Sequence, residues 1–559
     1  MSQTKALLRE RVSGLGSFSM KKLTLWVDGW RLAALGVACL VAVPLLVILS
    51  SIFRPTQDIW NHLMANVLPG LFANTGWLVL GVSLGTLFLG VSLGWLTAAC
   101  DFPGRRMFSW ALLLPLAMPA YVLAFIYLGL FDFAGPVQTA FRTLFPQTGF
   151  LFPDIRSTGG VILVMTLAFY PYVYLLSRNA FMTQGKSSME VARTLGLSPT
   201  ETFFKVCLPM ARPWIAGGLM LVIMETLADF GAVSVFNFDT FTTAIYKSWF
   251  GFFSLTSAAQ LSSILLFIVL AVLMVEQRLR ARMRYTHTGT SGLSTDRIKL
   301  LGGFGWAAFS FSLLVVLAGF VVPCAQLILW TIKIFHLEFG SGYFWLVGRT
   351  LYLASAAALL TCFGAIVLTY AKRRHPYSST SGLTRVATLG YALPGTVLAV
   401  GIFIPVAKVD NLLIGLIQSG FGYKASSLLQ GTIIIMFTAY LVRFMAIGFN
   451  AVDSAMQRIT PSIDEASNLM GVKGFALLRR IHIPMLKNGL LTALILVFVE
   501  VMKEMPITVM TRPFGWDTLA VKIFELTSEG EWERSALPAV ALVLVGLVPV
   551  IFLTRHSEK

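Results

Sequence analysis

The chain contains 559 residues, of which 56% are hydrophobic and only 12% are charged. Soluble domains carry roughly 25% charged residues, so this chain lacks the charge that a water-exposed surface requires. The composition excludes a cytosolic enzyme, a secreted disulfide-rich protein and a disordered protein. It indicates an all-α integral membrane protein that is built from many transmembrane helices.

Apolar runs long enough to cross a bilayer follow one another along the whole chain, since a hydrocarbon core requires about 20 such residues per helix. The first six runs lie near residues 31–53, 74–99, 107–131, 160–178, 213–233 and 257–276. Six more lie near 301–331, 346–370, 386–407, 428–448, 488–509 and 535–554. We therefore predict about twelve transmembrane helices. Pro394 and Pro405 interrupt the run at 386–407, which a membrane helix tolerates where protein surrounds it.

The basic residues predict the orientation in the membrane. The net charge of +17 lies in short patches between the apolar runs, which is typical of membrane topology and not of nucleic-acid binding. With a cytoplasmic N-terminus, most of the 43 Lys and Arg residues fall on the cytoplasmic side, as the positive-inside rule requires. An even number of spans then places both termini in the cytoplasm. The first run is too long for a secretory signal, so we expect an uncleaved helix.

The two sets of six spans are repeats of each other. Met118–Ala124 matches Leu393–Ala399, and Glu225 matches Glu500, at one constant offset of 275 residues. Each half holds an even number of spans, so the halves form a parallel repeat about an axis along the membrane normal. We divide the chain into a first half (1–276), a cytoplasmic linker (277–300) and a second half (301–559).

Two predicted cytoplasmic loops, 186–209 and 461–484, share one pattern. Glu, Gly and Pro have the same spacing in both: Glu190, Gly196 and Pro209, then Glu465, Gly471 and Pro484. We predict a short helix that ends at the Gly, followed by a second short helix that ends at the Pro. Apolar residues next to basic ones suit docking in the groove of a partner protein. A helix lying on the membrane surface is the alternative, but it does not require the same Gly and Pro twice.

This pattern resembles the signature loop of binding-protein-dependent ABC importer permeases: Glu-Ala-Ala, three residues, Gly, nine residues, Ile-x-Leu-Pro. In that family the loop forms the coupling helices that dock into two ATP-binding subunits. The resemblance assigns coupling to Glu190, Ala192, Gly196, Leu208, Pro209, Glu465, Ala466, Gly471, Ile483 and Pro484. Val191, Ser467, Val206 and Ile483 depart from the pattern, but they are compatible in size.

The same resemblance implies a fold and a set of partners. The fold is that of the type I ABC importer permeases, with two parallel six-helix repeats in the bacterial inner membrane. The partners are two copies of an ABC ATPase subunit, membrane lipid and a periplasmic substrate-binding protein. We expect the binding protein to dock on the external loops 132–159, 234–256 and 510–534.

Two such loops in one chain resemble the fused permeases for ferric iron (FbpB-like) and for thiamine. The segment Glu500–Pro506 is similar to a Glu-x-x-Lys-Glu-x-Pro segment of the ferric-iron branch. This implies ferric iron as the substrate, moved from periplasm to cytoplasm by alternating access. A permease for thiamine or for another small solute, such as a phosphonate, is one alternative. A secondary carrier with 6+6 helices, driven by an ion gradient, is the other, although it does not need a duplicated docking loop.

Four carboxylates lie inside or at the outer end of apolar spans: Glu225, Asp229, Glu500 and Glu504. An ionised acid at the bilayer centre costs about 2.5–3.5 kcal/mol even on insertion scales, so these side chains should face a bundle interior or a water-filled path. The spacing of four places each pair on one helix face. Either the oxygens line a path for a hard cation, or the acids pair with Lys503 or cap broken helices. We favour the structural role for Glu225 and Glu500.

No catalytic pattern stands out in the sequence. The six histidines form no HExxH, the five cysteines form no CxxC, and no GxxxxGK[ST] phosphate loop occurs. We therefore expect a transport subunit that is not an enzyme and that holds no metal or cofactor. ATP is expected to be hydrolysed by the partner subunits.

Overall fold

The computed structural model describes residues 29–53, 57–145, 154–183, 192, 194–282, 297–376, 378–421 and 427–557. Within these residues the regular secondary structure is helical apart from one short parallel pair. In that pair, β1 (Cys100–Asp101) lies beside β2 (Ile298–Lys299). The pairing connects the end of the second predicted span to the segment before the seventh. The predicted linker is described only in part, because α14 continues to Arg282 and residues 283–296 lie outside the described residues.

The helices of the two halves follow in the same order. The first half contains α2 (Gly29–Ser51), α3 (Gln57–His62), α4 (Leu68–Ala99), α5 (Arg105–Ala111), α6 (Ala120–Phe131), α7 (Pro136–Leu144), α8 (Thr158–Thr183), α10 (Pro199–Thr202), α11 (Leu208–Ala228), α12 (Gly231–Val235), α13 (Phe241–Tyr246) and α14 (Leu255–Arg282). The second half contains α15 (Gly303–Val316), α16 (Val322–Glu338), α17 (Ser341–Arg374), α18 (Ser378–Ala387), α19 (Gly395–Phe421), α20 (Ile433–Met456), α21 (Pro461–Leu469), α22 (Phe475–Leu477), α23 (Ile483–Met485), α24 (Lys487–Lys503), α25 (Pro506–Thr511), α26 (Leu519–Ser528) and α27 (Ala536–Ser557).

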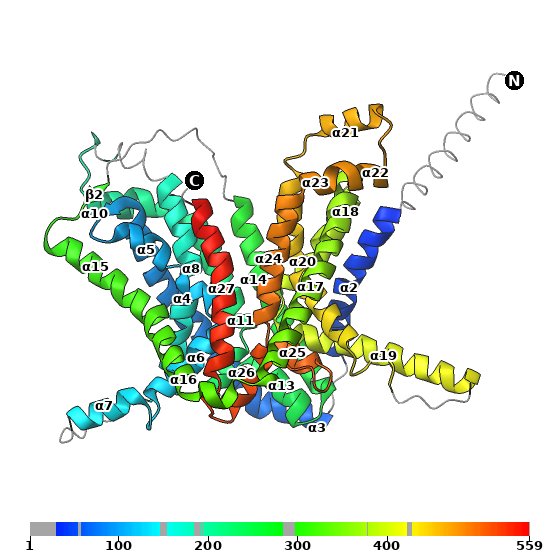
Figure 1. Cartoon of the computed structure of the whole chain (residues 1–559), viewed down its shortest axis with the longest axis horizontal. Coiled ribbons are helices and arrows are strands. Elements are labelled where there is room, and N and C mark those ends of the chain that lie inside the picture. Colours follow the sequence, from blue (N-terminus) through cyan, green and yellow to red (C-terminus); the bar gives the residue numbers. More distant parts are fainter. Residues whose placement is uncertain are drawn as a thin grey trace.

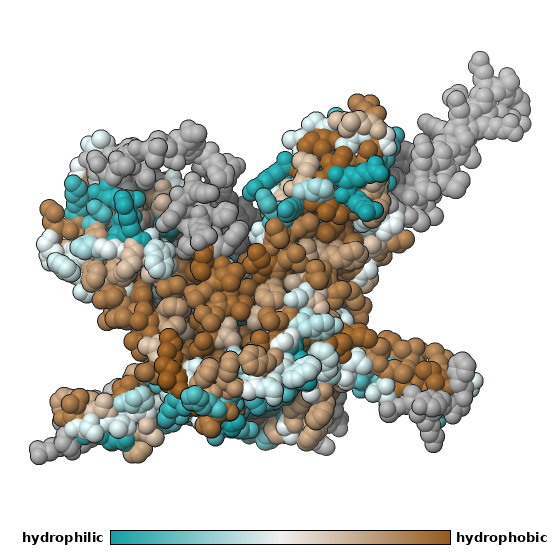
Figure 2. All heavy atoms as spheres, viewed as in Figure 1, coloured by the Kyte–Doolittle hydropathy of each residue, from teal (hydrophilic) through white to brown (hydrophobic). Residues whose placement is uncertain are grey.

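The predicted spans all fall on helices. Among the described residues, 10 helices are long and apolar enough to cross a membrane. Helices Phe475–Met485 and Lys487–Lys503 meet at a bend of 74°, and if this pair counts as one span, the number of candidate spans rises to 11. The 22-residue helix α27 covers the last predicted run. Figure 2 shows an apolar band around the middle of the molecule, with hydrophilic residues gathered at both ends. The all-α membrane fold with two repeats is thus confirmed.

Four predicted spans are broken, at corresponding positions in the two halves. The break at Pro394 was predicted, whereas Pro405 lies inside the continuous helix α19. Met118 and Leu393 have extended backbone angles, because the residue before a proline is excluded from the helical region. Asp229 and Glu504 also leave the helical conformation, and each is followed two residues later by a new short helix. The runs at 107–131, 213–233, 386–407 and 488–509 are therefore interrupted helices.

A local widening of the helix precedes four of the prolines. The π-helical turns Leu63–Val67, Phe203–Cys207, Leu317–Val321 and Leu478–His482 each end two residues before a proline. A proline has no N–H and its ring clashes with the carbonyl four residues earlier, and a π turn moves that carbonyl aside. The prediction that Pro209 ends a helix is therefore wrong, since one helix runs from Thr200 to Ala228. In the second half the chain bends just after Pro484.

The two halves are interlocked. Helices α4, α8 and α11 pack together in the first half, and α17, α20 and α24 pack together in the second. The first span of each half leaves its own bundle: α2 packs against α17, α18 and α19, while α15 and α16 pack against α5 and α6. Small residues such as Ala34 and Ala38 on the buried face of α2 allow this close approach. The crossed first spans thus clasp the two halves together.

Glycines let α4 and α8 pack with their backbones in contact. A Cβ atom on Gly90 would lie 2.6 Å from Cβ of Val173 and 2.8 Å from the backbone nitrogen of Tyr174. Backbone atoms of α8 cannot move aside as a flexible side chain can. A small residue at Gly90 is therefore a packing requirement.

We expect Gly90→Ala to lower the thermal stability of the detergent-solubilised protein, because overpacking a close helix contact costs about 1–3 kcal/mol. Gly76 lies on the same helix, and a Cβ atom added there would meet no other atom within 4 Å, so Gly76→Ala is the matched control. The measurement is the melting temperature of both variants. An equal melting temperature for the two variants would contradict the packing argument.

Candidate functional site: two docking loops and a central acidic cavity

The second docking loop (461–484) presents apolar side chains at its tip. Gly471 has a φ of +80° and its N–H donates to the carbonyl of Asn468 at 3.1 Å. Because Gly adopts this left-handed conformation at little cost, it ends α21 as predicted. Leu469 and Met470, just before it, are 89% and 72% exposed. Predicted residues Glu465 and Ala466 are exposed on the same helix.

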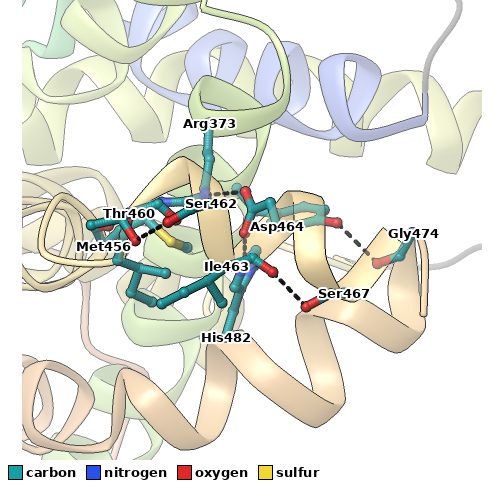
Figure 3. A network of polar contacts seen from close by, with 11 residues as sticks. Arg373, Met456, Thr460, Ser462, Ile463, Asp464, Ser467, Gly474 and His482 are labelled. Atoms are coloured by element: carbon teal, nitrogen blue, oxygen red, sulfur yellow. Dashed lines mark hydrogen bonds and ion pairs between the residues drawn. The ribbon is translucent and has the colours of Figure 1, made fainter. Parts of the chain in front are cut away.

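A polar network beneath α21 fixes this loop to the end of α17 (Figure 3). Nε of Arg373 donates to Oδ2 of Asp464 at 2.8 Å, and Nε2 of His482 lies 2.8 Å from Oδ1 of the same carboxylate. Arg373 also donates to the carbonyl oxygens of Met456 and Ile459. Burial raises the pKa of Asp464, but the hydrogen bonds from Arg373 and His482 lower it by more, so the pKa lies below its ordinary value of 3.8.

Two neighbours of Arg373 on α17 hold other parts of the same loop region. The hydroxyl of Tyr370 donates to the carbonyl of Gly474 at 2.9 Å, and Nζ of Lys372 lies 2.8 Å from Asp453 at the end of α20. One turn of α17 therefore contacts the second docking loop at Asp464 and Gly474 and the end of the preceding helix at Asp453. Sequence reasoning missed Arg373 and Asp464 because a charge at the end of a span also fits a solvated surface.

The first docking loop (186–209) has the same turn. Gly196 has a φ of +77°, and the N–H of Leu197 donates to the carbonyl of Ala192 at 3.1 Å, as Val472 does to Ser467 in the other half. Ala192 is buried, and Leu195 at the tip is 75% exposed. The predicted coupling residue Glu190 lies outside the described residues.

Aromatic side chains pack against the described part of the first loop, whereas ion pairs and hydrogen bonds attach the second loop. Trp95, at the position that corresponds to Tyr370, packs its ring 5.3 Å from Phe181 and 4.8 Å from Phe203. Of the remaining predicted coupling residues, Leu208 and Pro209 begin α11 and are half-buried. Ile483, which is half-buried, and Pro484, which is exposed, lie in α23 just before α24. Both loops lie at the same end of the molecule, on separate lobes that carry α10 and α21 (Figure 1).

We expect Asp464→Asn to loosen the second docking loop at neutral pH. The lowered pKa means that the carboxylate stabilises the loop fully above about pH 3.8, and that this stabilisation is lost as the pH falls through the folded-state value. The substitution replaces one carboxylate oxygen by an NH2 group, so Arg373 and His482 lose one of their two acceptors on residue 464. The expected cost is about 1–3 kcal/mol.

The measurement is the rate of trypsin cleavage at the exposed residues Arg479 and Arg480. Glu465→Gln, on the next residue, makes the same chemical change where the described structure shows no hydrogen bond or ion pair, so it controls for loss of charge alone. Equal cleavage rates in the two variants would show that the network does not hold the loop.

A second polar region lies between the halves, where the four broken spans meet. A cavity of about 160 Å³ is lined by residues of both halves. Its charged members are the four predicted carboxylates and two cations that face them: Glu225, Asp229, Glu500, Glu504, Arg443 and Lys503. The structure thus brings together all four acids, as the repeat predicts.

Two of the four carboxylates cap the short helices that follow the breaks. Oδ1 of Asp229 accepts from the N–H of Val233 at 3.2 Å, and Oε1 of Glu504 accepts from the N–H of Ile507 at 3.1 Å. Glu504 also forms an ion pair of 3.2 Å with Arg443. These contacts satisfy backbone groups that the breaks would otherwise leave without a partner.

The other two carboxylates, Glu225 and Glu500, form fewer contacts with the described part of the protein. Oε1 of Glu225 accepts from the hydroxyl of Tyr391, on the opposite half, at a long 3.4 Å. Glu500 makes no hydrogen bond or ion pair in the described part of the chain. The ammonium of Lys503 donates to the carbonyl of Leu116 at 3.1 Å and forms no ion pair with a described carboxylate. Glu225 and Glu500 therefore retain oxygen atoms that face the cavity.

No fixed metal centre is formed by these side chains. Among the described residues, no group of three or more His, Cys, Asp or Glu side chains lies close enough to hold a metal ion. The cavity can offer carboxylate oxygens in succession to a passing cation, but it does not enclose one in a cage of protein ligands.

Comparison with known proteins gives a family match and several relatives. The family model described as "Binding-protein-dependent transport system inner membrane component" matches residues 90–285 and again 362–559. The Fe(3+)-transport system permease protein FbpB 2 of Haemophilus influenzae is 27% identical over 88% of this chain and 90% of its own length. The ferric transport system permease protein FbpB of Actinobacillus pleuropneumoniae is 27% identical over 79% of this chain and 64% of its own length.

A third relative matches only part of the chain. The putative 2-aminoethylphosphonate transport system permease protein PhnV of Salmonella typhimurium is 26% identical over 38% of this chain and 73% of its own length. The two relatives named for ferric iron thus extend across both halves, whereas this one has the length of a single half.

Proposed function

Because the chain belongs to the family of binding-protein-dependent transport system inner membrane components and contains the family domain twice, we propose that it is the permease through which an ABC importer brings ferric iron into the bacterial cytoplasm. The relatives that are similar over most of the chain carry ferric-iron names. The central cavity supplies the physical support, since its carboxylates lie between the halves along the axis of the repeat.

The chemistry of the cavity suits a hard, highly charged cation. Such ions prefer carboxylate and water ligands, and a bare ion cannot cross hydrocarbon because desolvation costs tens of kcal/mol. If all six charged groups are ionised, the four carboxylates outnumber Arg443 and Lys503, so the cavity has an excess of negative charge. A cation that enters it offsets this excess.

We assign the substrate path to Glu225 and Glu500, which reverses the role that the sequence favours for them. Asp229 and Glu504 are engaged in capping and in the ion pair with Arg443. We expect that removing either carboxylate would mainly destabilise the short helix that it caps, and would affect binding of the cation only as a consequence. Glu225 and Glu500 are free to exchange partners with a passing ion.

Coupling to ATP hydrolysis is assigned to the two docking loops. We propose that each loop carries one ATPase subunit, on the cytoplasmic side with both termini, and that a periplasmic binding protein docks at the opposite end. Closure of the ATPase pair would draw the loops together and rock the interlocked halves about the central axis. This chain performs no covalent chemistry in that cycle.

We expect Glu225→Gln and Glu500→Gln to reduce the uptake of radioactive ferric iron by about tenfold or more, because each removes a charged ligand worth about 1.5–3 kcal/mol. Uptake is measured in cells that lack the chromosomal copy and express each variant at matched levels. Asp101→Asn alters a carboxylate that is 57% exposed and far from the cavity, so it should leave uptake unchanged.

Thiamine and 2-aminoethylphosphonate are assayed in the same cells. Uptake of either solute, without uptake of iron, would replace the iron assignment and leave the permease assignment intact. Unchanged iron uptake in both glutamine variants would remove the two carboxylates from the path.

We expect Gly471→Val to abolish co-purification of the ATPase subunit, since a β-branched residue is strained at a φ of +80° and the tip of the second docking loop would be displaced. Gly251→Ala, at a glycine with open space around it, is the control. A secondary carrier would show no associated ATPase and would transport equally well with either variant.

A further inference from the structure

A second, larger cavity lies at the end of the molecule opposite the docking loops. Its volume is about 800 Å³, and its walls come from α12 and α13 of the first half and from α26 of the second. We call it the outer vestibule. Charged side chains line it, among them Asp239, Lys247, Glu525 and Glu529. An aqueous chamber of mixed charge thus stands on the axis of the repeat, beyond the central cavity.

One residue lines both chambers. Phe230 belongs to the wall of the outer vestibule and also to the wall of the central cavity, yet its side chain is only 1% exposed. It follows Asp229 at the break between α11 and α12. The wall between the two chambers therefore contains Phe230.

The ring of Phe230 is held by aromatic partners from both halves. Its centroid lies 5.1 Å from that of Tyr246, in the first half, and 5.6 Å from that of Phe524, in the second. Tyr246 and Phe524 are themselves 5.9 Å apart. We call these three residues the aromatic partition. Because the partition contains one residue of the second half, its integrity depends on how the halves sit against each other.

The backbone next to Phe230 is also closely packed, at Gly231. A Cβ atom on Gly231 would lie 2.7 Å from Cε of Met505 and 2.8 Å from Cβ of Tyr121. Met505 belongs to the second half, so the contact again joins the halves. The backbone beside the ring is thus packed against both halves at this position.

We propose that the aromatic partition of Phe230, Tyr246 and Phe524 is the outer gate of the transport path, separating the outer vestibule from the carboxylates of the central cavity. An apolar constriction blocks a hydrated ion because it cannot replace the water around it. When the halves rock, Phe524 moves with the second half, the three rings separate and the two chambers join. This inference rests on the proposed transport function but does not depend on the identity of the substrate.

Two engineered cysteines report on the two chambers. Ser528 lines the outer vestibule and Ala228 lines the central cavity, and both are small residues outside the assigned machinery. Ser528→Cys and Ala228→Cys are each made alone, and each is combined with Phe230→Ala, with Phe524→Ala or with Phe253→Ala. Phe253 lies between α13 and α14 and is 90% exposed, so it is the matched control. Whole cells are first depleted of ATP so that the halves do not rock, and they are then treated with a membrane-impermeant maleimide. The unchanged chain with its five cysteines gives the baseline.

The cysteine at 528 is expected to react in every background. The cysteine at 228 should stay at the baseline alone and with Phe253→Ala, and should react once either Phe230 or Phe524 is truncated. Phe524→Ala matters most, because residue 524 lies in the other half and cannot perturb residue 228 through the local chain. Reaction at 228 with the partition intact, or no reaction at 228 in either of the two truncated backgrounds, would overturn the proposal. No iron is used, so the result is independent of the substrate assignment.

Discussion

The structure depends on one constraint, which is that a chain broken inside the hydrocarbon region must find new partners for its freed backbone groups. Four spans are broken near the axis of the repeat. The carbonyl of Leu116, three residues before a proline that has no N–H, accepts from Lys503, and the carbonyl of Leu393 accepts from Arg443. Asp229 and Glu504 accept the free N–H groups of the next short helices. The charges at the centre therefore follow from the breaks, and the polar cavity follows from the charges.

The contacts that repair the breaks also join the halves. Lys503 of the second half reaches Leu116 of the first, and the hydroxyl of Tyr391 in the second half reaches Glu225 in the first. Leu116 and Tyr391 occupy corresponding positions of the repeat, so the halves hold each other in a reciprocal way. Together with the crossed first spans, this arrangement opposes separation of the halves, and it is compatible with the rocking that we propose. A path through the centre then needs a barrier that rocking can open, which is the role proposed for the aromatic partition.

The two docking loops share a backbone turn but not an attachment. The second loop is held by Arg373 and its neighbours on α17, and the first is packed around Trp95. A charged attachment adds directional hydrogen bonds, whereas the aromatic one relies on apolar burial and ring packing. The two loops are therefore attached differently in the described part of this chain, although the repeat makes them look alike.

The sequence by itself determined what depends on local pattern. Apolar runs marked the spans, the offset between Glu225 and Glu500 marked the repeat, and Gly196 and Gly471 marked turns that need a left-handed residue. Tertiary structure alone decided which carboxylate caps a helix and which faces the cavity, that Arg373 supports Asp464, and that Phe230 stands between two chambers. The reason is physical: periodicity and turn chemistry act over a few residues, whereas these roles are set by partners brought together from distant parts of the chain, such as Phe524 for Phe230.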